Sequence, residues 1–213
     1  MPRPMPPLDR RFHRQSLDAL ELASAGEDIR LLPNAHRAIF QIFHISRVEL
    51  LYELAFLRIY ASWEAFLEES FFRYLCGFSS RFGQSSMVRG RYFPNLSDAQ
   101  RSVLSGHRYL LWHSVDQVAR RCSRHMRACR HEIVLSSNRA RLENLGAIRH
   151  RIVHNHADAR ARFDSATMTF AGRRYRGARP GRFLRDINPA IVRGGRWLES
   201  LANELNGLAS QIL

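Results

Sequence analysis

Residues 148–156 read IRHRIVHNH and place two arginines and three histidines within nine positions. Arginine binds phosphate oxygens through a planar fork of donors, and histidine titrates near neutral pH, so it can move protons. Together these residue types suit acid–base chemistry on a phosphodiester. Arginine would hold the non-bridging oxygens and the developing charge, while histidine would move the proton of a 2′-hydroxyl or a leaving oxygen.

Two other interpretations of this stretch stay open from the residues alone. His150 and His154 are four apart, which on a helix is the spacing of a metal-binding pair, with His156 as a possible third ligand. No HExxH glutamate lies between them, and the surrounding arginines would repel a divalent cation. Alternatively, the stretch is a basic helix end whose side chains favour the C-terminal dipole and solvate the surface.

Arg149 occupies an unusual position if the segment from Leu142 onward is helical. At about 100° per residue it falls on the apolar arc rather than opposite to it. The arc is made of Leu142, Leu145, Ile152 and Val153. A buried guanidinium keeps its charge, so it must face a carboxylate, a phosphate or a subunit interface. Arg149 and His154 lie roughly 140° apart on an ideal helix. They would therefore converge only if the helix ends near His154 or if a second copy supplies half of the site.

The pattern Arg149-His150-x3-His154 resembles the Arg-polar-x3-His motif of the HEPN superfamily. The overlapping frame, Arg151-Ile152-x3-His156, has an apolar second residue and fits less well. The aromatic segment LYELAFLRIYASWEAFLEESFFRYLCG, residues 51–77, is similar to the first core helix of the prokaryotic RiboL-PSP-HEPN type. LENLGAIRHRIVHNH, residues 142–156, then stands in the place of the motif helix. The resemblance covers residues 46–213.

This resemblance implies a homodimer in which two motif helices face each other and build a shared, metal-independent ribonuclease site with no cofactor. Arg149 would hold phosphate, His154 would act as general acid or base, and His150 would orient one of them. Members of the superfamily commonly act as RNA-cleaving toxins or in defence against phage. The resemblance therefore also implies RNA as substrate and an antitoxin or other protein as a possible partner.

Two further residues are candidates for supporting roles in that site. Glu64, in the segment SWEAFLEES, could pair with Arg149 from the central helix, or it could be an ordinary exposed acid like its neighbours Glu68 and Glu69. Asn155 could be a second polar contact or a helix-end residue. The competing functional hypothesis is a non-catalytic HEPN-like module that binds RNA, nucleotide or protein.

The charge of the chain points to a polyanionic partner. The 33 basic residues exceed the 19 acidic ones and give a formal net charge of +14, and every basic residue is arginine. Such a surplus favours nucleic acid first and anionic membrane second, because each neutralised phosphate releases counterions. The candidate RNA-binding residues are Arg120, Arg121, Arg124 and Arg151, within arginine-rich surfaces at 120–130 and 173–182.

The periodicity of the chain predicts an all-α, HEPN-like helical bundle. A disordered basic arm is expected over residues 1–14, a helical extension over 15–45 and the main domain over 46–213. Within that domain we expect a long central helix over 48–75, a helix that Ser114 caps, and a small β-hairpin or irregular loop near 167–177. A final amphipathic helix is expected after Asn188-Pro189.

Other features of the composition set limits on the class of protein. No stretch approaches the roughly 18 uninterrupted apolar residues of a membrane span, and the first residues lack the apolar core of a signal peptide, so we expect a soluble cytoplasmic protein. The three cysteines, Cys76, Cys122 and Cys129, have no CxxC spacing. They favour reduced, buried thiols over a disulfide or zinc framework.

Overall fold

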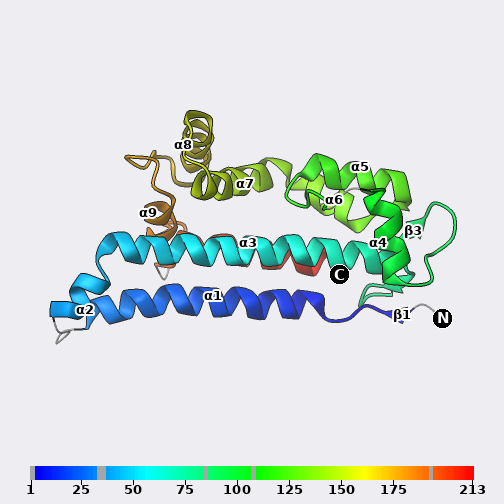
Figure 1. The fold of residues 1–213 in the computed structure, drawn as a ribbon, viewed down its shortest axis with the longest axis horizontal. Coiled ribbons are helices and arrows are strands. Elements are labelled where there is room, and N and C mark those ends of the chain that lie inside the picture. The colour runs from blue at the N-terminus through cyan, green and yellow to red at the C-terminus, as the bar shows by residue number, and fades with distance from the viewer. Residues whose placement is uncertain (1–2, 33–36, 84–85, 107–108, 192–193) are drawn as a thin grey trace. The chain divides into compact units, whose positions relative to one another are not determined.

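A computed structural model of the chain describes residues 3–32, 37–83, 86–106, 109–191 and 194–213. Within these ranges the protein is about 70% helical, with ten helices and two short two-stranded sheets (Figure 1). The expectation of a mostly helical protein is therefore confirmed. Within the same ranges, no helix is both long and apolar enough to cross a membrane.

The helices are α1 (Leu8–Leu31), α2 (Arg37–Ile42), α3 (Ile45–Leu75), α4 (Leu96–Leu104), α5 (Val115–His125), α6 (Arg130–Ser137), α7 (Arg139–Val153), α8 (Ala157–Ala171), α9 (Pro180–Arg185) and α10 (Trp197–Ile212). The strands are β1 (Arg3–Pro4), β2 (Phe78–Ser79), β3 (Met87–Val88) and β4 (Met126–Ala128). β1 pairs with β2 in parallel, and β3 pairs with β4 antiparallel.

The chain divides into two compact units. The first unit contains Met1–Phe12, Ser62–Glu143 and Asn206–Leu213, and the second contains His13–Ala61 and Asn144–Leu205. Helices α1, α3, α7 and α10 each contribute residues to both units. The candidate RNA-binding arginines of α5 thus belong to the first unit, and the histidine-rich stretch belongs to the second.

The long helix predicted over 48–75 is confirmed as α3, whose aromatic residues fill the core of each unit. Trp63, Phe66 and Phe71 are at most 2% exposed in the first unit, and Tyr52 and Phe56 are equally buried in the second. Gly77, at φ 80°, follows the end of the helix in the left-handed region that glycine tolerates. A helix with so wide an apolar surface is stable only when it is covered by neighbours on several sides.

The expected disordered arm over residues 1–14 is corrected by the structure from Arg3 onward. Arg3 and Pro4 pair with Phe78 and Ser79, and α1 begins at Leu8. Phe12 is 1% exposed, and its ring centroid lies 5.9 Å from that of Trp63. The basic composition of this segment favoured disorder, but burial of the large apolar side chain of Phe12 stabilises the segment within the first unit.

The expected hairpin near 167–177 is also corrected. Helix α8 continues to Ala171 and ends at Gly172, whose φ is 65° and whose N–H donates to the Met168 carbonyl at 3.0 Å. Phe163, Thr167 and Phe170 are buried at helical spacing, so the short apolar alternation before Gly172 belongs to a helix face. The residues from Gly172 to Arg179 form an irregular loop.

A chain of buried polar groups connects α3, α5 and α6 in the first unit. Ser70 Oγ donates to the Phe66 carbonyl at 2.7 Å and lies 2.8 Å from His131 Nε2. His131 Nδ1 lies 3.8 Å from Cys129 Sγ, which is 2.8 Å from Cys122 Sγ. All three cysteines are buried, as expected. Because Cys122 stands on α5, this chain helps to fix the helix that carries Arg120, Arg121 and Arg124.

Candidate functional site

The end of α7 is fixed by a backbone hydrogen bond and by the side chain of Arg151, all within the histidine-rich stretch. The His154 N–H donates to the His150 carbonyl at 2.9 Å and closes the last turn. Arg151 then donates to the His154 carbonyl at 3.0 Å and to the Ala178 carbonyl at 3.0 Å. Arg151 therefore satisfies a carbonyl at the helix end and ties the 172–179 loop to it.

His156 begins the next helix. It is the N-cap residue of α8, and its Nδ1 accepts from the Ala159 N–H at 3.2 Å. A ring that accepts at Nδ1 carries the proton of its neutral form on Nε2, so that edge of His156 is a donor. Only three residues, 154–156, separate α7 from α8.

This tight connection gathers the three histidines. The ring centroids of His150 and His154 are 4.5 Å apart, those of His150 and His156 are 5.2 Å apart, and those of His154 and His156 are 5.7 Å apart. His150 is partly buried, while the other two rings are exposed. Burial lowers the pKa of His150, and the positive charges of His154, His156 and Arg162 lower it further. Both effects favour the neutral imidazole, which can accept a proton.

Arg149 lies one residue before this cluster and is partly buried. Leu142, Leu145 and Ile148 form the buried face of α7, whereas Val153 is 51% exposed, so the expected apolar arc is corrected at its C-terminal end. Arg149 forms no hydrogen bond or ion pair with any residue in the described ranges. Its guanidinium is therefore available to an anionic ligand.

The predicted supporting residues have other contacts in the structure. Glu64 lies in the first unit, where its carboxylate is 3.0 Å from His113 Nδ1, and its proposed pairing with Arg149 stays a prediction. Asn155 is exposed and accepts a hydrogen bond from Arg160 at 3.0 Å. Asn155 thus supports the turn between the two helices.

The second unit also presents a donor set that could hold a metal. One ligand atom from each of His150, His156 and Asp158 lies within 4.8 Å of the other two. Two imidazoles and a carboxylate are ligands that zinc accepts. However, the cap to Ala159 occupies His156 Nδ1, and Asp158 pairs with Arg162 at 2.9 Å. A metal would have to displace the Arg162 contact and bind beside several guanidinium groups.

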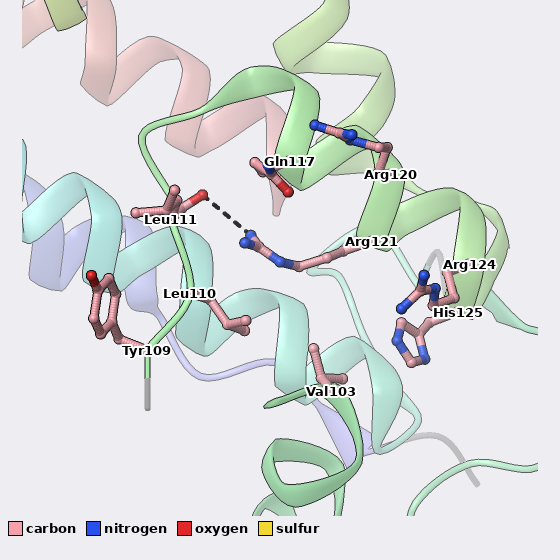
Figure 2. A pocket seen from close by; sticks show the side chains of 9 residues that line it. All are labelled: Val103, Tyr109, Leu110, Leu111, Gln117, Arg120, Arg121, Arg124 and His125. Carbon is pink, nitrogen blue, oxygen red and sulfur yellow. Dashed lines mark hydrogen bonds between the residues drawn. The ribbon is translucent and has the colours of Figure 1, made fainter. Parts of the chain in front are cut away.

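A second candidate site lies in the first unit, where α5 and the 109–111 segment enclose a cavity of about 540 Å³ (Figure 2). The predicted RNA-binding residues Arg120, Arg121 and Arg124 all line this cavity. Sequence reasoning missed the rest of its lining: Val103, Tyr109, Leu110, Leu111, Gln117 and His125. His125 could have been found, because it stands one helical turn from Arg121.

A third cationic hollow, of about 600 Å³, belongs to the second unit. Its six arginines are Arg173, Arg174, Arg176, Arg182, Arg185 and Arg196. Four of them lie within the predicted 173–182 surface. Arg173 pairs with Asp186, while Arg185 and Arg196 pair with Glu27. The 172–179 loop that carries three of these arginines is the loop that Arg151 ties to the end of α7.

Comparison with protein-family models, curated proteins and solved structures finds no match to this chain. The resemblance to the HEPN superfamily therefore rests on the motif and its helices. The function must be argued from the residues and their geometry.

Proposed function

We propose that this protein is a metal-independent endoribonuclease of the HEPN type that acts in the cytoplasm as a homodimer. Its biological role would be that of a toxin or of a phage-defence effector. The observation that carries the proposal is the grouping of His150 and His154, with ring centroids 4.5 Å apart, directly after Arg149, which has no anionic partner among the described residues. Two imidazoles, one of them the proposed acid or base, and a proposed phosphate-binding cation thus lie within six residues at one helix end.

In the proposed reaction, the 2′-hydroxyl of the RNA attacks the adjacent phosphorus and the bond to the 5′-oxygen breaks. The base takes the hydroxyl proton, and the acid returns a proton to the leaving oxygen. The products are a 2′,3′-cyclic phosphate and a 5′-hydroxyl. His154 moves a proton, neutral His150 orients the site, and Arg149 binds the non-bridging oxygens as their negative charge grows. The second copy in the dimer would supply the other half of the acid–base pair.

The positive surface supports RNA as the substrate. The three arginines that line the first-unit cavity stand on α5, and six arginines line the hollow of the second unit. Contacts of this kind bind the backbone without reading sequence and weaken as salt rises. An antitoxin or another protein would be the natural partner of such an enzyme if it acts as a toxin.

A second candidate function is a non-catalytic HEPN-like module that binds RNA, nucleotide or protein. One observation favours it: two of the five basic side chains in the stretch have structural contacts. Arg151 caps α7 and His156 caps α8. In this alternative, Arg149 and His154 bind a ligand and no bond is broken.

The experiment that tests the proposal is RNA cleavage by the purified full-length protein in EDTA. Arg149→Ala and His154→Ala should each lower the cleavage rate by about 10²–10⁴-fold with the fold intact by circular dichroism. Arg14→Ala and His13→Ala remove the same side-chain types from exposed positions on α1 and should cleave like wild type.

Equal cleavage by all five proteins would contradict the proposal, since the activity would not come from this cluster. RNA binding without cleavage by wild type would favour the non-catalytic alternative. Activity that is lost in EDTA and restored by zinc would instead favour the metal site at His150, His156 and Asp158.

A further inference from the structure

The cavity of the first unit has two chemically different walls. One wall is cationic and comes from α5, with Arg120, Arg121 and Arg124 beside His125 (Figure 2). The other wall is largely apolar and comes from the end of α4 and the 109–111 segment. The volume of the cavity, about 540 Å³, lies within the range of about 300–1,000 Å³ that is typical of small-molecule sites.

Arg121 is held in place before any ligand arrives. Its guanidinium donates to the Leu111 carbonyl at 3.3 Å and lies over the Trp112 ring, 4.8 Å from the centroid. Burial lowers the pKa of Arg121, while the nearby Glu68 carboxylate opposes this effect. A pre-positioned cation binds an anion at a smaller cost in side-chain entropy.

Arg124 differs from Arg121 because it is exposed and has no hydrogen bond or ion pair with any residue in the described ranges. Arg120 is exposed too, and its Nε donates to the Asp116 carbonyl at 3.4 Å, so most of its fork is unused. Among the residues that the structure describes, no acidic side chain lines the cavity. A group of three arginines without a lining carboxylate attracts an anion, and their planar forks match phosphate.

The apolar wall narrows the choice of anion. Inorganic phosphate would use only the arginines and leave Leu110 and the 75% exposed Tyr109 without a partner. A nucleobase has flat apolar faces and stacks on aromatic side chains, while Gln117 offers an amide donor and acceptor for a base edge. We propose that this cavity binds a nucleoside monophosphate group, with the phosphate against the three arginines of α5 and the base against the 109–111 segment.

This group has two possible sources, a free nucleotide or the 5′-phosphorylated end of an RNA, and the chemistry of the cavity is the same for both. The site lies in the first unit, whereas the histidine cluster lies in the second. Binding here therefore does not require the protein to cleave RNA, and the two proposals can fail separately.

The test is calorimetric titration of the full-length protein with adenosine monophosphate, adenosine and inorganic phosphate, each alone. Adenosine monophosphate should bind at least about tenfold more tightly than either part, because only the whole group contacts both walls. A short RNA with a 5′-phosphate should compete with the nucleotide, and the same RNA with a 5′-hydroxyl should not, if the RNA end is a source. Competition by neither RNA would assign the cavity to free nucleotides.

The variant Arg124→Gln should weaken binding of adenosine monophosphate by about tenfold or more, since a charged hydrogen bond is lost. Arg91→Gln removes the same charge from an exposed position of the first unit that lies outside both the cavity and the 120–130 surface, and should bind like wild type. Phosphate or adenosine binding as tightly as the nucleotide would overturn the proposal. Equal binding by the two variants would overturn it as well, even if His154→Ala has abolished cleavage.

Discussion

The ion pair between Glu27 and Arg185 offers a sharp test of how the second unit is held together. Arg185 Nε and Nη2 donate to the two oxygens of the Glu27 carboxylate at 2.8 Å and 2.6 Å, and Arg196 Nη2 lies 3.4 Å from one of them. Glu27 is 5% exposed, so the pair is mostly removed from water on the carboxylate side. Glu27→Gln keeps the shape but loses the charge and one acceptor. We expect the free energy of unfolding to fall by about 1.5–3 kcal/mol, the value of a hydrogen bond to a charged group.

The pH dependence of this loss follows from the pKa of Glu27. The hydrogen bond from Arg185 lowers that pKa more than burial raises it. A carboxyl with a lowered pKa stabilises the fold above its unfolded pKa, and this stabilisation disappears as the pH falls through the folded pKa. Wild type should therefore exceed Glu27→Gln in stability at pH 7, and the difference should shrink at pH values below the ordinary range of glutamate.

Thermal and urea unfolding followed by circular dichroism would measure both effects. A loss of about 2 kcal/mol corresponds to a Tm lower by roughly 4–8 °C in a chain of this size. Glu21→Gln removes the same charge from an exposed position on α1 and should change Tm by less than about 2 °C. A Glu27→Gln protein as stable as this control, or a difference that stays constant down to pH 3, would refute the reasoning.

Three further predictions concern the histidine cluster and the contacts that hold α5 and α7. Arg151→Ala should lower the free energy of unfolding by about 1–2 kcal/mol in urea titrations, because the His154 and Ala178 carbonyls lose their donor; an unchanged midpoint would show that water replaces it at no cost. Ser70→Ala should cost about 1–3 kcal/mol by the same measurement, since it leaves His131 Nε2 buried without its partner, and stability equal to wild type would count against the buried chain. In proton NMR, the ring signals of His150 should titrate below the ordinary pH range of histidine, because burial and its positive neighbours lower the pKa of His150. A midpoint within that ordinary range would contradict the cluster geometry.

The features that sequence reasoning predicted well depend on residues close together in the chain. The aromatic stripe of residues 48–75 predicted α3 because helical periodicity repeats within a few turns. Ser114 was predicted to start a helix, and its side chain accepts from the Gln117 N–H as the N-cap of α5. The same periodicity places Arg120, Arg121 and Arg124 on one helix, and their role in RNA binding stays a prediction.

The features that it missed depend on contacts between distant segments. The burial of Phe12 against Trp63 could not be read from a basic, proline-rich N-terminus. The apolar wall at 109–111 became part of a cavity only because that segment folds back toward α5. The hairpin expected near 167–177 is wrong because Phe163, Thr167 and Phe170 are buried at helical spacing, whereas the alternative of an irregular loop holds from Gly172 onward.

The sequence by itself determined the helical class, the cationic surface and the proximity of Arg149, His150 and His154 along one segment, since composition and short-range periodicity need no tertiary partner. Only the tertiary structure decided where α7 ends and how His156 caps α8, and hence that three rings gather within 4.5–5.7 Å of one another. The position of a helix end depends on which carbonyls find donors. Here the Arg151 guanidinium donates to the His154 carbonyl and also to the carbonyl of Ala178, which lies 27 residues after Arg151 in the chain.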